Sequence, residues 1–279
     1  MHRLLCSTGA LLGRANGRDF RLLPGFSEQL RCDGLELMFY DSWYQQEEAI
    51  VSTLKTLALP ILTFHAEKNI CQGILNPETT ALALEHFQDN CRLAHAAGAE
   101  KIVFHLWDGY MNHDQICSMF SFLPELNGMA KNEKLLFTVE NIVCPTNSPL
   151  FYLQKIHEAY PAIAFTYDTK MASFHFQEDA LYAPETESLL PAIRHFHIND
   201  YSGGYMEWPK FKTLHPGEGQ VDFCRLFSFL RKIDYREDFT TEATSFNQQG
   251  IVDIDKLNRT LASLRQYISK ETDNHGPKR

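Results

Sequence analysis

The sequence predicts an α/β protein with a single (β/α)8 TIM barrel. Three observations predict it: the length of 279 residues, the alternation of short apolar runs with helical patterns, and the absence of a low-complexity linker. A barrel of this kind takes about 250 residues. Apolar residues make up 44% of the chain, which suffices for one large core. We therefore expect one domain over residues 1–270 and a polar tail over 271–279.

Eight runs have the length and residue types of strands. Strands that alternate with helices pair in parallel, because each crossover needs a helix to return the chain. An open doubly wound sheet would show the same alternation, but the count of eight favours closure into a barrel. The expected strands are 4–7, 34–39, 61–65, 101–106, 135–140, 164–168, 194–198 and 239–242.

Helical patterns fill the intervals between these runs. The longest is expected over 77–97, because Asn76 can cap its start, Pro77 suits the first helical position and Gly98 follows its end. The other expected helices are 45–58, 148–160, 223–233 and 254–268, with weaker patterns over 19–30 and 184–192.

Composition restricts the class of protein. The net charge of −9 argues against a nucleic-acid surface, which needs a local density of Lys and Arg. The seven cysteines contain no CxxC pair, so we expect reduced thiols in a cytoplasmic protein. The first apolar stretch is interpreted as a strand and not as a signal peptide, and no run is long enough to span a membrane. The sequence does not decide whether the protein forms a homo-oligomer.

Ionisable residues stand at the ends of six successive strands. A carboxylate after an apolar run is costly to bury without a partner charge. One such residue could cap a helix or pair with an arginine, but six are harder to explain in that way. Strand ends of a parallel barrel converge on one mouth, and a metal ion is the simplest common partner there. The residues are His65, His105, Glu140, Asp168, His195, His197, Asp200 and Glu242.

Five short motifs occur in order along these strand ends: TVEN (138–141), YDT (167–169), FHIND (196–200), HPGEG (215–219) and TEA (241–243). Together they resemble the xylose isomerase-like barrel superfamily. That group includes sugar isomerases and epimerases, inosose dehydratases, hydroxypyruvate isomerase and the endonuclease IV family. The resemblance covers nearly the whole chain.

The resemblance implies four ligands for a divalent metal ion, Glu140, Asp168, His197 and Glu242, and we expect one such ion per chain. Carboxylates with one imidazole suit Mn, Mg, Co or Zn. The resemblance also implies that Glu140 and Glu242 transfer protons, and chemistry agrees: a metal acidifies the C–H beside a carbonyl, one carboxylate takes the proton and another returns it. From the barrel topology, we expect these two glutamates to face each other across a small sugar.

Several neighbouring residues are candidates for substrate binding. His65 and His105 stand where the endonuclease branch places further metal ligands, but we expect them to bind substrate by hydrogen bonds. Trp107 and Trp208 lie in strand-end loops and could form an apolar wall under a sugar. His215, in the loop after the seventh strand, could reach the same site. The alternatives without a functional role are that the tryptophans only pack in the core and that the loop containing His215 is an ordinary Pro-Gly turn.

Two positions bear on the metal count. His195 stands two residues before His197 and so faces the same side of its strand, either as a support for the ligand or as a core residue. Many relatives carry a histidine three residues after the aspartate of the sixth strand, where this chain has Met171. A thioether is a poor ligand for hard divalent ions, which argues against a site with several zinc ions.

Three functions follow as hypotheses. The first is a metal-dependent isomerase or epimerase of a small sugar, polyol or hydroxy-carbonyl compound, with a dehydratase as a close variant. The second is a phosphodiesterase of the endonuclease IV kind acting on abasic DNA, which the charge and Met171 argue against. The third is a barrel that binds a sugar without catalysis. Metal-dependent turnover of sugars, nicking of abasic DNA, and binding without turnover distinguish the three.

Overall fold

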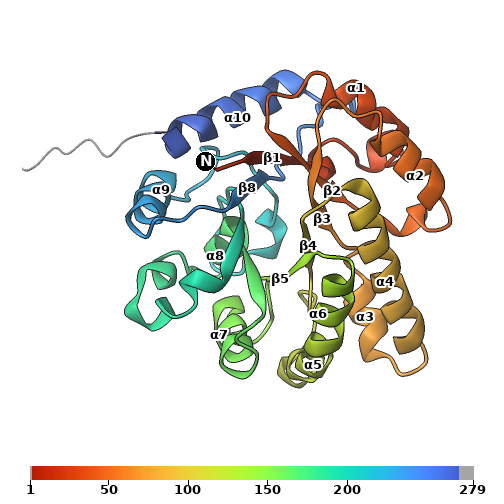
Figure 1. The fold of residues 1–279 in the computed structure, drawn as a ribbon. Coiled ribbons are helices and arrows are strands. Elements are labelled where there is room, and N and C mark those ends of the chain that lie inside the picture. The colour runs from red at the N-terminus through yellow and green to blue at the C-terminus, as the bar shows by residue number, and fades with distance from the viewer. Residues whose placement is uncertain (1, 270–279) are drawn as a thin grey trace, which may run out of the picture.

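The computed structural model describes residues 2–269 and shows a closed barrel of eight parallel strands, joined in the order of the sequence (Figure 1). This confirms the predicted (β/α)8 barrel. The predicted tail over 271–279 lies outside the described residues. The strands are β1 (Leu4–Ser7), β2 (Gly34–Met38), β3 (Ile61–His65), β4 (Lys101–Phe104), β5 (Leu136–Glu140), β6 (Ala164–Asp168), β7 (Ile193–His197) and β8 (Asp238–Thr241).

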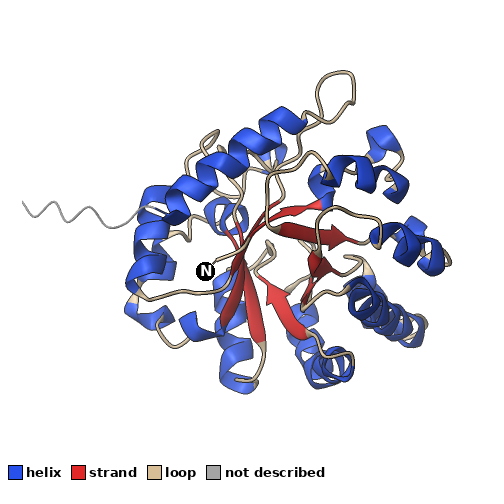
Figure 2. Ribbon diagram, turned by 45° about the horizontal axis from the view of Figure 1, so that its top comes forward, coloured by secondary structure: helices blue, strands red, loops and turns tan. Residues whose placement is uncertain are grey.

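Helices surround the strands on the outside (Figure 2). No helix within residues 2–269 is both long enough and apolar enough to cross a membrane. The α-helices are α1 (Leu23–Ser27), α2 (Glu47–Leu54), α3 (Ile70–Leu75), α4 (Thr80–Ala97), α5 (His113–Met119), α6 (Leu123–Asn132), α7 (Pro149–Ala159), α8 (Thr169–Phe174), α9 (Phe223–Lys232) and α10 (Ile254–Ser269).

Helices α7, α9 and α10 agree with the predicted ranges to within one residue at each end, whereas α2 ends four residues before the predicted 58. Helix α4 ends at Ala97 as predicted, and Gly98 after it has a left-handed φ of 86° that glycine adopts without strain. It begins three residues later than expected, because Asn76 accepts the N–H of Glu78 and closes a turn before the helix. Short 3-10 turns replace the helix expected over 184–192. Helices α3, α5, α6 and α8 are not predicted by the sequence patterns above.

The amino-terminal end of the barrel is closed by buried charges. Asp238, the first residue of β8, accepts hydrogen bonds from Lys101 Nζ at 3.0 Å and from Arg3 at 2.7 and 2.9 Å. Both Lys101 and Asp238 are buried. Burial alone would raise the pKa of Asp238, but Arg3 and Lys101 lower it to about 2. Polar residues at this end of a barrel serve stability, whereas the opposite end serves function.

We expect Asp238→Asn to lower the free energy of unfolding by about 2–3 kcal/mol at neutral pH, because it removes the buried carboxylate that Arg3 and Lys101 share and leaves Lys101 only the longer ion pair to Glu237 at 3.3 Å. A carboxyl whose folded pKa is depressed stabilises the fold above its unfolded value and loses that contribution as the pH falls. The difference between wild type and variant should therefore shrink from about pH 4 towards pH 2, as urea unfolding would measure. Glu100→Gln is the control: Glu100 also contacts Arg3 but is 53% exposed, and it should matter little. Equal effects of both substitutions would contradict this assignment.

Candidate metal centre

A cavity of about 860 Å³ opens at the carboxyl ends of the strands, which is the size of a small-molecule site. Its walls come from loops after several strands, as the barrel topology requires. Among the ionisable and aromatic residues that line it are Arg18, Tyr40, His65, Glu67, His105, Glu140, Lys170, Trp208 and Glu242.

The structure brings the four residues of the predicted ligand set together. Glu140, Asp168 and His197 are the last residues of β5, β6 and β7, and Glu242 follows β8 directly. One oxygen or nitrogen of each lies within 4.8 Å of those of the others. The first three are buried, whereas the side chain of Glu242 is 14% exposed to the cavity. This set has the oxygen and nitrogen donors that hard divalent ions prefer.

The ring of His197 faces carboxylates on both of its nitrogens. Nδ1 is 3.0 Å from Glu140 Oε1 and 3.5 Å from Glu242 Oε2, while Nε2 is 3.2 Å from Glu36 Oε2. Burial alone would lower the pKa of His197, but the carboxylates of Glu242, Glu36 and Glu140 raise it well above its usual range. A proton on Nδ1 therefore satisfies the two oxygens beside it, and a divalent cation could take the place of that proton.

Asparagine and backbone groups hold the other two carboxylates. Asp168 Oδ1 caps α8 by accepting the N–H groups of Lys170 and Met171 at 2.6 and 3.1 Å. Asn199 Nδ2 donates to Asp168 Oδ2 at 2.9 Å and to Glu242 Oε2 at 3.0 Å. Burial raises the pKa of Asp168 to about 6. Asn199 thus fixes the spacing of two predicted ligands, a role that its place in FHIND does not reveal.

His65 and His105 lie on the other side of Glu140. Their Nε2 atoms are 3.3 and 2.8 Å from Glu140 Oε2, and the two rings meet edge to face. Burial raises the pKa of Glu140 by itself, but His197 and His105 lower it well below its usual range. These three residues form a second group of possible ligands that shares Glu140 with the first. Both histidines line the cavity, so substrate binding stays open to them as predicted.

Two other predicted substrate-binding residues are not among those that line the cavity. Trp107 is buried and donates its indole N–H to the carbonyl of Ile142 at 2.9 Å. His215 is held between Thr260 and Ser245 at 2.7 and 2.9 Å. Both side chains are thus held by hydrogen bonds within the protein, and a role in substrate binding stays a prediction for both.

Trp208, the other aromatic residue considered for an apolar wall, lies at the cavity. Trp208 lines the cavity and stacks on Tyr110, with ring centroids 5.9 Å apart and an angle of 11° between the rings. Tyr110 is 81% exposed. Met171, at the position where many relatives have histidine, also lines the cavity. The mouth therefore offers apolar surface beside the carboxylates, as a sugar face requires.

Glu140 and Glu242 lie closer together than the topology alone suggested. One oxygen of each is within 4.8 Å of the other, so these two oxygens cannot flank a sugar ring from opposite sides. The reason is His197, whose Nδ1 contacts both carboxylates and draws them to one point. Both residues line the cavity.

The fold and this site define a TIM barrel with a cluster of carboxylates and imidazoles at its mouth. The chain belongs to the xylose isomerase-like TIM barrel family, whose model matches residues 26–267. No curated protein sequence matches the chain.

Solved structures with the same fold include three sugar epimerases. A D-allulose 3-epimerase from Methylomonas sp. in complex with D-allulose has a TM-score of 0.71 and 14% identity over 95% of this chain and 97% of that one. A 3-keto-D-glucoside 4-epimerase from E. coli has a TM-score of 0.66 and 18% identity over 95% and 100%. An L-ribulose 3-epimerase has a TM-score of 0.65 and 14% identity over 99% and 100%. The shared architecture thus extends over the full length of these enzymes.

Proposed function

We propose that this protein is a divalent-metal-dependent isomerase or epimerase of a small sugar, polyol or hydroxy-carbonyl compound. The observation that carries the proposal is the convergence of Glu140, Asp168, His197 and Glu242 within 4.8 Å, with Glu140 and Glu242 lining a cavity of about 860 Å³. The family and the epimerase names of structural neighbours support the same class of reaction.

The four converging residues would hold one ion of Mn, Mg, Co or Zn. The structure fits this role because three carboxylates and one imidazole nitrogen meet there, and oxygen-rich sets of this kind suit such ions. When bound, the ion would polarise a carbonyl or hydroxyl of the substrate and so acidify the neighbouring C–H.

Proton transfer falls to the two glutamates. Glu242 is the more accessible, since its side chain is 14% exposed and that of Glu140 only 1%. Asn199 fixes Glu242 through its backbone N–H and one carboxylate oxygen. Glu242 would take the proton from carbon and release it to solvent, and Glu140 would return a proton that reaches it from solvent through His105, 2.8 Å away.

Residues that line the cavity would bind the sugar. Trp208 and Tyr110 would lie against its apolar face. His65 and His105 would bind its hydroxyls. Lys170 Nζ, which donates to Thr213 at 3.0 Å and lines the same cavity, is a further donor.

A screen of ketoses and inosose-like compounds tests the proposal. The protein would be loaded in turn with Mn, Mg, Co or Zn, and products would be followed by chromatography and by solvent deuterium entering the carbon skeleton. D-Allulose is the first compound to try, because a structural neighbour binds it. We expect metal-dependent interconversion with deuterium incorporation. Binding of sugars without turnover or exchange would contradict the proposal in favour of a binding protein, and nicking of abasic DNA would replace it with a phosphodiesterase.

A further inference from the structure

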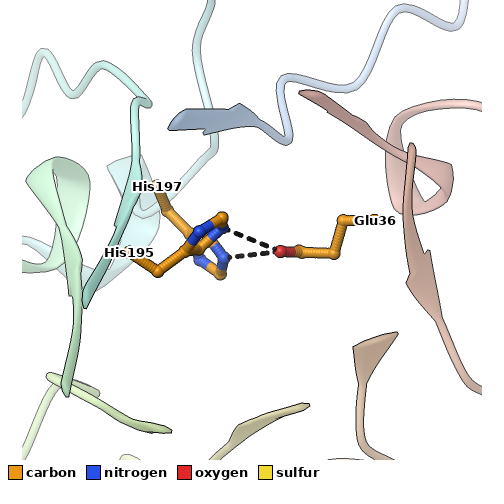
Figure 3. A group of neighbouring side chains, drawn as sticks. All are labelled: Glu36, His195 and His197. Carbon is orange, nitrogen blue, oxygen red and sulfur yellow. Dashed lines mark hydrogen bonds and ion pairs between the residues drawn. The ribbon is translucent and has the colours of Figure 1, made fainter. Parts of the chain in front are cut away.

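A buried cluster of Glu36, His195 and His197 lies inside the barrel (Figure 3), and it shares His197 with the four candidate metal ligands. Glu36 reaches from β2 across the barrel towards the two histidines on β7. Its Oε2 is 3.1 Å from His195 Nε2, 3.2 Å from His197 Nε2 and 3.3 Å from Thr240 Oγ1. All four side chains are fully buried.

The hydrogen bonds define which nitrogen of His197 faces the ligand cluster. A carboxylate only accepts hydrogen bonds, so a hydrogen bond to Glu36 Oε2 requires a proton on His197 Nε2. When a cation replaces the proton on Nδ1, the ring is neutral and presents the Nδ1 lone pair on the side of Glu140 and Glu242. The tautomer and the ring plane are thus set from the side opposite to the cavity.

A purely structural role explains this arrangement poorly. A charged carboxylate inside a barrel loses its hydration, and apolar side chains of similar volume usually stabilise such a position at least as well. Glu36 Oε1 has no hydrogen-bond partner among the described residues, so all three donors converge on one oxygen. His195 Nε2 lies 2.9 Å from Thr240 Oγ1 as well, which fixes His195 beside the carboxylate.

We infer that Glu36 is a positioning residue for metal binding, which orients His197 and holds its proton on Nε2 so that Nδ1 can bind a cation. His195 and Thr240 keep the Glu36 carboxylate in place. The inference rests on the proposed function, because it takes His197 as a ligand of the proposed metal ion. Partners of this kind typically change metal affinity about 10–100-fold when they are removed.

Two substitutions separate the charge of Glu36 from its hydrogen bond. Glu36→Gln keeps an oxygen that can accept from His197, and we expect about tenfold weaker binding of Mn²⁺ and Co²⁺ by calorimetry. Glu36→Met keeps the volume but removes the acceptor, and we expect about 100-fold weaker binding. The visible spectrum of the Co²⁺ form should change in the same order, because it reports the ligands around the ion.

The matched control is Thr63→Val, on the neighbouring strand. Thr63 pairs with Glu36 in the sheet, is buried, and has a hydroxyl without a hydrogen-bond partner among the described residues. The Thr63→Val variant should bind Mn²⁺ and Co²⁺ as tightly as the wild type does. Thermal unfolding of the metal-free proteins shows whether each variant is folded. If Glu36→Met does not fold, the metal affinity of Glu36→Gln alone tests the role of Glu36.

The outcomes distinguish this inference from the proposed function. A wild-type protein that binds neither Mn²⁺, Mg²⁺, Co²⁺ nor Zn²⁺ would remove the metal site itself. A wild-type protein that binds Mn²⁺ and Co²⁺, with Glu36→Gln and every folded variant binding equally tightly, would overturn the role of Glu36 and leave the metal site intact. Graded loss of affinity with an unchanged Thr63→Val control supports it.

Discussion

Glu242→Gln is expected to lower turnover about 10²–10⁴-fold, the usual contribution of a residue that transfers a proton in the transition state. Glu242 is the candidate ligand most accessible from the cavity, and Asn199 already fixes its position. The substitution keeps the size of the side chain, so the fold should survive. Because Glu242 is also a proposed ligand, turnover should be measured at saturating metal, together with the rate of solvent deuterium exchange into the substrate.

Glu67→Gln provides the matched control for this experiment. Glu67 lines the same cavity, but its carboxylate accepts the backbone N–H of Asn69 and stands outside the ligand cluster. We expect its turnover to stay within a few-fold of the wild type. A Glu242→Gln enzyme with near wild-type activity on its true substrate would remove Glu242 from the mechanism.

Removal of the metal by a chelator should abolish turnover, and about one equivalent of a divalent ion per chain should restore it. Four residues converge on one point, which is sufficient for one ion with positions left for substrate oxygens. Met171 supplies no ligand of the kind that a further hard ion would need. Elemental analysis of the purified protein, with anomalous scattering from a crystal, measures the number of ions.

The group of His65, His105 and Glu140 is where a second ion could bind, because it shares Glu140 with the four-residue cluster. Counting the bound ions therefore tests the single-metal prediction directly. We expect His105→Gln to leave the stoichiometry at one and to weaken substrate binding instead. Two or three fully occupied ions at the mouth would contradict the single-metal prediction, and they would favour a phosphodiesterase of the endonuclease IV kind.

The sequence alone determined the barrel and the strand ends that carry chemistry. The runs over 4–7, 61–65 and 164–168 agree with β1, β3 and β6 to the residue. Strands β2, β4 and β5 differ by one or two residues at one end, and β7 and β8 are each shifted by one residue. Parallel strands joined by helices must point the same way, so Glu140, Asp168 and His197 had to arrive at one mouth once the order of elements was known. His195 likewise faces the interior with His197, as the two-residue period of a strand requires.

Only the tertiary structure decided which side chains meet. Glu36 lies more than 150 positions from His195 in the chain, and the closure of the barrel brings them to 3.1 Å. In the sequence, Glu36 is noticeable as a charged residue within the apolar run GLELM, but the run does not indicate which residues it contacts. Likewise, Trp107 and Trp208 both follow strands, yet only Trp208 lines the cavity. The physical reason is that periodicity determines the face of a strand, whereas strand tilt, register and loop path determine contacts across a closed barrel.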